Sequence, residues 1–246
     1  MEPLYELNDL GQPVGLLVPR WRAPARPVGA GQAGTHVRLE RLNARLHGPS
    51  LHAAARADRS GESWTYMAYG PFANEADHLS WIESVAEATD PLFLAIVNPQ
   101  GQALGHASFM RIVPRHGVLE IGHVYFSPAL QRTAAATEAL MLMLSEAFSL
   151  GYRRVEWKCN ALNTTSRRAA ERLGFRFEGV FRSSMVVKGR NRDTAWFAML
   201  DHEWPRVQAA MQAWLAPDNF DERGRQRKAL SALRAPATPA PPRTTP

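Results

Sequence analysis

The chain of 246 residues contains a single cysteine, Cys159, so no intrachain disulfide framework can form. It also lacks any apolar run that approaches the ~20 residues needed to span a membrane as a helix. Its first residues, Met1 to Glu6, show neither the basic start nor the apolar stretch of a signal peptide. From these absences we expect a cytoplasmic protein that has no membrane partner.

A long basic run is absent as well, although the chain is positively charged. It has 29 lysines and arginines against 23 aspartates and glutamates, which gives a formal net charge of +6. Such an excess can indicate nucleic-acid binding, but here the basic residues are spread over several short segments without a nucleic-acid motif. We therefore do not expect nucleic acid as a partner. Arginines also suit a ligand that carries several phosphates.

The middle of the chain differs in composition from both ends. Residues 1–34 contain several prolines and glycines and predict an extended arm, which the apolar segment Val14–Val18 and Trp21 should pack onto the domain. Residues 35–216 alternate strand-like and helix-like segments and should form one globular domain. Residues 217–246 become charged and then rich in alanine and proline, which predicts a tail that is disordered at its end.

Hydrophobic periodicity predicts the elements of the central domain. Expected strands cover Thr35–Leu42, Leu92–Val97, Ala103–Val113, Val118–Phe126, a half-buried Arg154–Cys159, Ser183–Val187 and Thr194–Leu200. Expected helices cover Leu46–Arg59 with Pro49 near its start, Asn74–Ala88 with Asn74 as N-cap, Thr137–Leu150, and Ser166–Leu173. This order predicts an α/β (α+β) protein, with a mixed, mainly antiparallel twisted sheet and helices on both faces.

The most informative segment is Gln131–Ala136, which joins the strand-like Val118–Phe126 to the helix-like Thr137–Leu150. Its small side chains would let a ligand approach the backbone where the helix begins. The unpaired N–H groups and the positive dipole end of such a helix favour a phosphate or pyrophosphate. The alternative is that these alanines only pack the start of the helix.

The order of two motifs points to a family. Gln131, Ala134 and Ala136 fall on the fixed positions of the acetyl-CoA loop of the GNAT N-acetyltransferase superfamily, Gln/Arg-x-x-Gly-x-Gly/Ala, which the segment resembles. Further on, Asn160–Ser166 followed by Gly174-Phe175 resembles the second GNAT signature, in the form of the RimJ/RimL-like branch. The departure is Ala134 in the usual glycine position, which is tolerable only if this residue does not need positive φ.

This resemblance implies a GNAT fold with a splayed central strand pair and an acetyl-CoA-dependent N-acetyltransferase. The acetyl group would pass directly to a primary amine, in a ternary complex and without a metal. The amine would belong to a small molecule, an aminoacyl-type compound or a protein N-terminus. The segments Trp64–Phe72, Gly122–Phe126 and Lys188–Asp193 together look like a RimJ/RimL-like subgroup that includes the acetyltransferase domain of microcin C immunity proteins. The residues implied to bind acetyl-CoA are Val124, Tyr125, Phe126, Gln131, Arg132, Thr133, Ala134, Ala135, Ala136, Thr137, Asn160 and Asn163.

Gly122 lies inside the strand Val118–Phe126, where a glycine usually marks a bulge or a close backbone approach. Glu120 and His123 are the candidates for the general base that neutralises the amine. Their odd spacing places them on opposite faces of a regular strand, but a bulge at Gly122 would bring both to one side. Either residue remains open as the base, and His123 is equally well explained as a core histidine.

The chain lacks one residue that commonly protonates the leaving thiolate, which limits the choice of acid. Many GNAT members place a tyrosine where this chain has Ala170. Ser166 matches a serine that RimL-like members carry and becomes the candidate. Alternatively, Ser166 only caps or decorates the start of its helix, and Asn163 can serve as N-cap instead of binding pantetheine.

The segment Trp64–Phe72 contains four aromatic residues in a loop, which is more than a linker needs. The residues predicted to line the acceptor site are Trp64, Tyr66, Tyr69 and Phe72. The alternative is a satellite hydrophobic cluster.

A second class of function also stays open at this stage. A non-catalytic module that binds acyl-CoA or a protein partner would explain both Ala134 and Ala170. The sequence does not determine the acceptor amine or the oligomeric state, and a homodimer stays open as one form.

Overall fold

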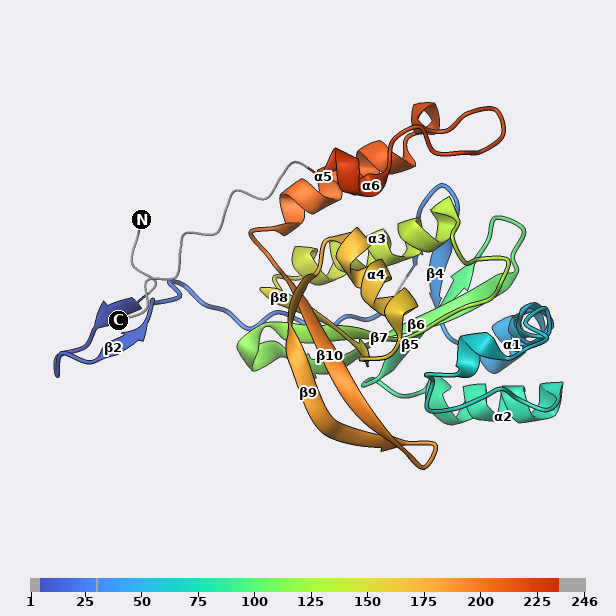
Figure 1. The fold of residues 1–246 in the computed structure, drawn as a ribbon, viewed down its shortest axis with the longest axis horizontal. Coiled ribbons are helices and arrows are strands. Elements are labelled where there is room, and N and C mark those ends of the chain that lie inside the picture. Colours follow the sequence, from blue (N-terminus) through green and yellow to red (C-terminus); the bar gives the residue numbers. More distant parts are fainter. Residues whose placement is uncertain (1–4, 30, 235–246) are drawn as a thin grey trace.

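The computed structural model describes residues 5–29 and 31–234, and the end of the C-terminal tail, predicted to be disordered, lies outside them (Figure 1). The described chain builds one large sheet with the strand order β3-β4-β5-β6-β7-β8-β10-β9. Its strands are β3 (Gln32–Ala33), β4 (Arg38–Arg41), β5 (Leu92–Val97), β6 (Ala103–Val113), β7 (Val118–Phe126), β8 (Arg154–Asn160), β9 (Arg176–Val187) and β10 (Arg190–Leu200). Only the neighbours β7 and β8 run parallel.

Helices cover both faces of this sheet, as predicted (Figure 1). The helices are α1 (Ala44–Ala55), α2 (Glu75–Ala86), α3 (Ala134–Ser149), α4 (Thr164–Leu173), α5 (Trp204–Leu215) and the short α6 (Leu230–Leu233), with 3-10 turns at Glu62–Trp64, Pro114–His116 and Pro217–Asn219. α1 and α2 enclose the smaller hydrophobic core, whereas α3, α4 and α5 enclose the larger one on the opposite face. β5 is buried along its whole length because it lies between the two cores.

The local signals that begin helices explain where the structure departs from the predicted bounds. Asn74 caps α2 as predicted, accepting the backbone N–H of Asp77 at 2.9 Å. Asn43 caps α1 in the same way, so this helix starts before the predicted Leu46 and ends before Arg59. The placement of Pro49 near the helix start was therefore wrong. The ring lies inside α1 on an exposed side, where water can bond the carbonyl that proline leaves unpaired.

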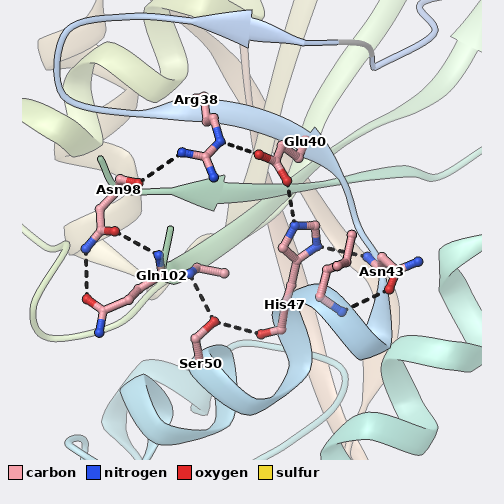
Figure 2. Close-up of polar contacts among 9 residues, drawn as sticks. Arg38, Glu40, Asn43, His47, Ser50, Asn98 and Gln102 are labelled. Atoms are coloured by element: carbon pink, nitrogen blue, oxygen red, sulfur yellow. Dashed lines mark hydrogen bonds and ion pairs between the residues drawn. The ribbon is translucent and has the colours of Figure 1, made fainter. Parts of the chain in front are cut away.

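A polar network ties α1 to the edge of the sheet (Figure 2). Glu40 accepts a hydrogen bond from Arg38 and lies 2.9 Å from Nε2 of the buried His47. The other ring nitrogen of His47 accepts the backbone N–H of Asn43, which requires the tautomer that carries its hydrogen on Nε2. Ser50 donates to the carbonyl of His47 and accepts the first backbone N–H of β6 at 3.0 Å. The network fixes α1 against β4 and β6.

The N-terminal arm packs on the domain only in part. Its first residues form a separate hairpin of β1 (Tyr5–Leu7) and β2 (Pro13–Gly15), which stands away from the body in Figure 1. The apolar segment Val14–Val18 is exposed, so the prediction that it packs on the domain was wrong. Trp21 does make contact, because its ring lies against Gly117 and 5.9 Å from the guanidinium of Arg153.

Candidate active site

The parallel strands β7 and β8 separate at the centre of the sheet. Their pairing comprises three residue pairs and ends where Glu120 meets Glu156. Beyond that point, β7 continues to Phe126 beside β6, and β8 continues to Asn160 beside β10. The facing edges of the two strands therefore carry backbone groups that do not bond to each other. This confirms the predicted splayed pair.

A β-bulge lies in β7 directly after Gly122. His123 and Val124 together oppose the single residue Ala107 of β6, and His123 takes a φ of 50°. Gly122 itself allows a close approach, because a Cβ there would meet Sδ of the flexible Met110 side chain, which would have to move. The bulge predicted at Gly122 therefore occurs, but at the next two residues.

The bulge places both base candidates on the face covered by α1 and α2. The ring of His123 lies 4.9 Å from that of Phe93, which belongs to the core beneath these helices. Glu120 lies on the same face as Gly122. Its Oε1 is close to the position that a Cβ of Gly122 would take, where Met110 also lies. Burial, together with the charge of Arg192, lowers the pKa of His123 to about 4. His123 is therefore a neutral imidazole at physiological pH.

Glu120 belongs to a buried charge cluster that it forms with β8. Its carboxylate lies 3.0 Å from Nζ of Lys158, which is also 2.6 Å from Glu156. Arg111 approaches the same carboxylate at 3.4 Å. Burial raises the pKa of Glu120, and the charges of Lys158 and Arg111 oppose this shift. The prediction of a half-buried strand was wrong here, because the Lys158 side chain on the charged face is only 6% exposed.

The start of α3 has the geometry of an anion site. The helix begins at Ala134, three residues before the predicted Thr137, because Thr133 caps it and accepts the N–H of Ala136 at 3.1 Å. The first-turn N–H groups of Ala134 and Ala135 have no acceptor within the helix. Ala134 is helical, and the residue with positive φ is Arg132, at 63°. The alanine in the usual glycine position is therefore compatible with the loop.

Two other residues predicted to bind acetyl-CoA have side chains that are engaged within the chain. Gln131 donates from Nε2 to the carbonyl of Phe126 at 2.8 Å and to Ser63 at 3.0 Å. Thr137 is buried in α3, and its hydroxyl accepts a hydrogen bond from Arg172. Gln131 therefore fastens the loop to the end of β7, and Thr137 lies one turn inside the helix.

The start of α4 lies beside the opposite face of β8. Asn163 is the N-cap of α4, since its side chain accepts the N–H of Ser166 at 3.0 Å. The hydroxyl of Ser166 accepts the indole N–H of Trp157 at 3.0 Å and lies beside the thiol of Cys159. Asn160 accepts a backbone N–H two residues further on at 2.9 Å. Ser166 is thus held in place next to the splayed end of β8, with its own hydrogen available for donation.

The aromatic loop forms a cluster over β7. Trp64 is 2% exposed and stacks on Tyr125 with a centroid distance of 4.0 Å. The hydroxyl of Tyr69 lies 3.1 Å from Nε2 of the buried His106, and its ring faces His123 at 5.6 Å. Tyr66 is partly exposed and donates to a carbonyl just before α4 at 3.3 Å. Trp64 therefore lies in the packing beneath the loop, Tyr69 borders the region beside the bulge, and Tyr66 lies towards the start of α4.

Phe72 packs on a histidine that has an unusual environment. The rings of Phe72 and the buried His78 stack at 4.4 Å, and both line a small pocket with His52, Asp58 and Trp64. Within the described residues, neither ring nitrogen of His78 has a hydrogen-bond partner. Burial, with the charge of His52 as a smaller cause, lowers the pKa of His78 to about 4.

This shift predicts a loss of stability in mild acid. Below pH 6.5 the unfolded chain protonates His78 while the folded chain does not, so the free energy of unfolding falls as the pH falls towards 4. His78→Phe keeps the stacking ring without the titration. It should reduce the difference in unfolding free energy between pH 7 and pH 5 by roughly 2 kcal/mol, measured by denaturant titration. The same pH dependence in His78→Phe and in wild type would refute the prediction.

Two positively charged residues of this face were missed by the sequence interpretation. Lys158 was placed correctly on the charged side of β8 by the alternation of the sequence. Its burial was not foreseen, because it depends on Trp196 of the neighbouring strand β10, whose ring centroid lies 3.7 Å from Nζ. Arg192 follows the turn of the hairpin β9–β10. The tip of this hairpin is fastened to the aromatic loop, because Lys188 donates to the carbonyls of Trp64 and Gly70 at 3.0 and 2.8 Å.

Two searches of the described chain concern other classes of site. No group of three or more histidine, cysteine or acidic side chains in residues 5–29 and 31–234 is arranged to hold a metal ion. None of the helices in the same residues is long and apolar enough to cross a bilayer.

Comparison with known proteins identifies the family. The family model described as "Acetyltransferase (GNAT) domain" matches residues 37–176, which is more than half of the chain. The chain belongs to this acetyltransferase family. The GNAT fold and the resemblance stated from the two motifs are thereby confirmed.

Solved and curated GNAT proteins resemble the chain over most of their own length. The crystal structure of a GCN5-related N-acetyltransferase from Brucella melitensis is 47% identical, with a TM-score of 0.86, over 88% of this chain and 99% of that chain. The uncharacterised N-acetyltransferase YnaD of Bacillus subtilis (strain 168) is 27% identical over 56% of this chain and 81% of its own. The microcin C7 self-immunity acetyltransferase MccE, solved with acetyl-CoA and AMP, is 22% identical with a TM-score of 0.60, over 68% and 93% of the two chains. At that identity, the likeness to MccE shows the fold alone.

Proposed function

We propose that this GNAT acetyltransferase transfers the acetyl group of acetyl-CoA directly to a primary amine in a ternary complex. The observation that carries the proposal is the splay between β7 and β8, which opens next to the capped start of α3. An extended thioester arm fits between two strands that leave backbone groups unpaired, and a pyrophosphate fits at the first turn of a helix. The acetyl-CoA in the MccE structure, on the same fold, supports this choice of donor.

The residues present fit such a donor. The backbone of Val124 to Phe126 faces the splay, and the first turn of α3 carries only the methyl side chains of Ala134, Ala135 and Ala136. Arg132 is exposed beside them and supplies positive charge for phosphates. The amides of Asn160 and Asn163 lie at the far end of β8, where they can meet a pantetheine arm.

The chemistry is divided between the two faces of the sheet. On the face of α1 and α2, the carboxylate of Glu120 or the neutral imidazole of His123 takes a proton from the acceptor ammonium. The free amine then attacks the acetyl carbonyl, a new amide bond forms and the carbon–sulfur bond breaks. A backbone N–H near Val124 or Tyr125 stabilises the oxyanion. On the other face, Ser166 donates its hydroxyl hydrogen to the departing thiolate, and the second proton lost by the attacking nitrogen returns through water to restore this hydroxyl.

The acceptor enters beside the aromatic loop, where Tyr69 borders the bulge and packs on Trp64 and Phe72. Tyr66 lines the side of this entrance towards α4. Its amine belongs to a small molecule, an aminoacyl-type compound or a protein N-terminus. The membership of the RimJ/RimL-like branch and the cytoplasmic location stay predictions from the sequence.

A thiol-release assay with purified protein, acetyl-CoA and a panel of amines tests the proposal. We expect free thiol to appear at a rate that depends on both substrates, with intersecting lines in a two-substrate kinetic analysis, as a ternary complex requires. Binding of acetyl-CoA in calorimetry without release for any amine would instead identify a non-catalytic acyl-CoA-binding module.

A further inference from the structure

Arg192 is a half-buried arginine on β10 whose charge is not matched by the described chain. No carboxylate of residues 5–29 and 31–234 lies within ion-pair distance of its guanidinium, and its buried Nε lacks a hydrogen-bond acceptor among them. Burial lowers the pKa of Arg192, against the opposing charges of Cys159 and Glu120. A desolvated guanidinium without a partner is costly, so it favours a ligand that supplies the missing charge.

The strand register places Arg192 on the face that carries Glu120. Thr194 and Trp196 of β10 pair with Asn160 and Lys158 of β8, and Trp196 lies under the ammonium of Lys158. Arg192 precedes Thr194 by two residues and so points to the same side of β10 as Lys158 does from β8. It therefore faces the acceptor side of the splay.

The charges on that face leave a positive excess. The carboxylates of this cluster, Glu120, Glu156 and Glu178, are matched in number by Lys158, Arg111 and Arg154, which form ion pairs with them. Arg192 adds a further positive charge to this balance. An anionic group of the acceptor that pairs with Arg192 would neutralise this excess charge and leave the ion pairs of Glu120 intact.

The hairpin that carries Arg192 is held in position before any ligand binds. Lys188, at its turn, donates to two carbonyls of the aromatic loop, and Asp193 accepts the backbone N–H of Ser183 at 2.7 Å. The backbone that carries Arg192 is thus fixed beside the acceptor region, near enough to His123 for the charge of Arg192 to act on that ring. Preorganisation reduces the cost of fixing a ligand.

We propose that Arg192 binds an anionic group, a carboxylate or a phosphate, on the acceptor molecule. This inference rests on the proposed function and makes it narrower, because the acceptors become amines that carry a negative charge. A guanidinium matches both oxyanions through two parallel hydrogen bonds, which would hold the amine in a fixed position relative to Glu120 and His123.

Matched acceptor pairs test the proposal: an amino acid with its amide, and O-phosphoethanolamine with ethanolamine. Wild type should acetylate the anionic member of at least one pair with the higher kcat/KM. Arg192→Met should lower that kcat/KM by roughly 10- to 100-fold, as expected for a lost hydrogen bond to a charged group, and change the neutral member by less than about threefold. The pair that responds tells a carboxylate from a phosphate.

The control is Arg182→Met, on the opposite face of the same hairpin, where the side chain is exposed. It should keep the preference for the anionic member. A fall in acetyl-CoA affinity for Arg192→Met in calorimetry would assign the arginine to the coenzyme and overturn the proposal. Equal use of both members by wild type would overturn it while the proposed function stands. If no amine releases thiol, thermal melts with the anionic probes decide. The anionic probe must raise the melting temperature of wild type more than that of Arg192→Met, or the proposal fails.

Discussion

Replacing Ala135 with aspartate should raise the dissociation constant for acetyl-CoA by more than about 100-fold while α3 stays folded. The side chain is half-buried in the first turn of α3, where a carboxylate would lie next to the proposed pyrophosphate. The same carboxylate interacts favourably with the helix dipole, which should stabilise the free protein by roughly 0.3–1 kcal/mol. Ala136 is a poorer position for this test, because it is 6% exposed and packs in the core.

The neutral control is Ala135→Asn, which adds almost the same volume without charge. Calorimetry on both variants separates bulk from charge, since only the aspartate repels phosphate. A thermal melt confirms that each variant is folded. Unchanged acetyl-CoA affinity in a folded Ala135→Asp protein would show that the start of α3 does not hold the pyrophosphate.

Removing the hydroxyl of Ser166 should slow the chemical step by roughly 10- to 1,000-fold, the range expected for loss of general-acid assistance. Ser166→Ala creates almost no cavity and leaves the cap from Asn163 in place, because that bond uses the backbone N–H. It does remove the acceptor of the Trp157 indole, which should cost about 1–3 kcal/mol of stability. Acetyl-CoA affinity should stay near that of wild type.

Single-turnover rates measured below the melting temperature of the variant check this prediction. Trp157→Phe serves as the control, since it removes the same hydrogen bond but keeps the hydroxyl. Ser166→Thr should recover part of the rate because it restores a hydroxyl. If Trp157→Phe is as slow as Ser166→Ala, the serine only positions the indole, and the acid must be sought elsewhere.

The elements of the fold could be predicted where local signals are strong. The bounds of β5, β6 and β7 agree with the prediction, because Gly and Pro mark their turns and their apolar runs are continuous. The start of α3 was placed too late, since Ala134–Ala136 were interpreted as part of a loop although Thr133 caps the helix before them. Strand β9 was predicted only in its second half, because the residues from Arg176 are exposed and show no regular alternation.

The site was predictable in its backbone part and not in its charges. Gly122 and the segment before α3 can be recognised from the few residues around them. By contrast, Arg192 lies on the same side of the sheet as Glu120 only because β10 lies next to β8, and strand order is a long-range property that no local pattern contains. The burial of Lys158 has the same origin, since it depends on the ring of Trp196 from the neighbouring strand.

The separation of β7 from β8 also affects how the site tolerates mutation. The proposed contacts of Val124, Tyr125 and Phe126 with acetyl-CoA use main-chain atoms, which nineteen of the twenty amino acids supply identically and only proline alters. The side chains of this segment are free to meet other requirements, as the stacking of Tyr125 on Trp64 shows. In a saturation scan of Val124, Tyr125 and Phe126, substitutions other than proline should therefore act through packing. Proline alone should weaken acetyl-CoA binding directly, because it alters the main chain.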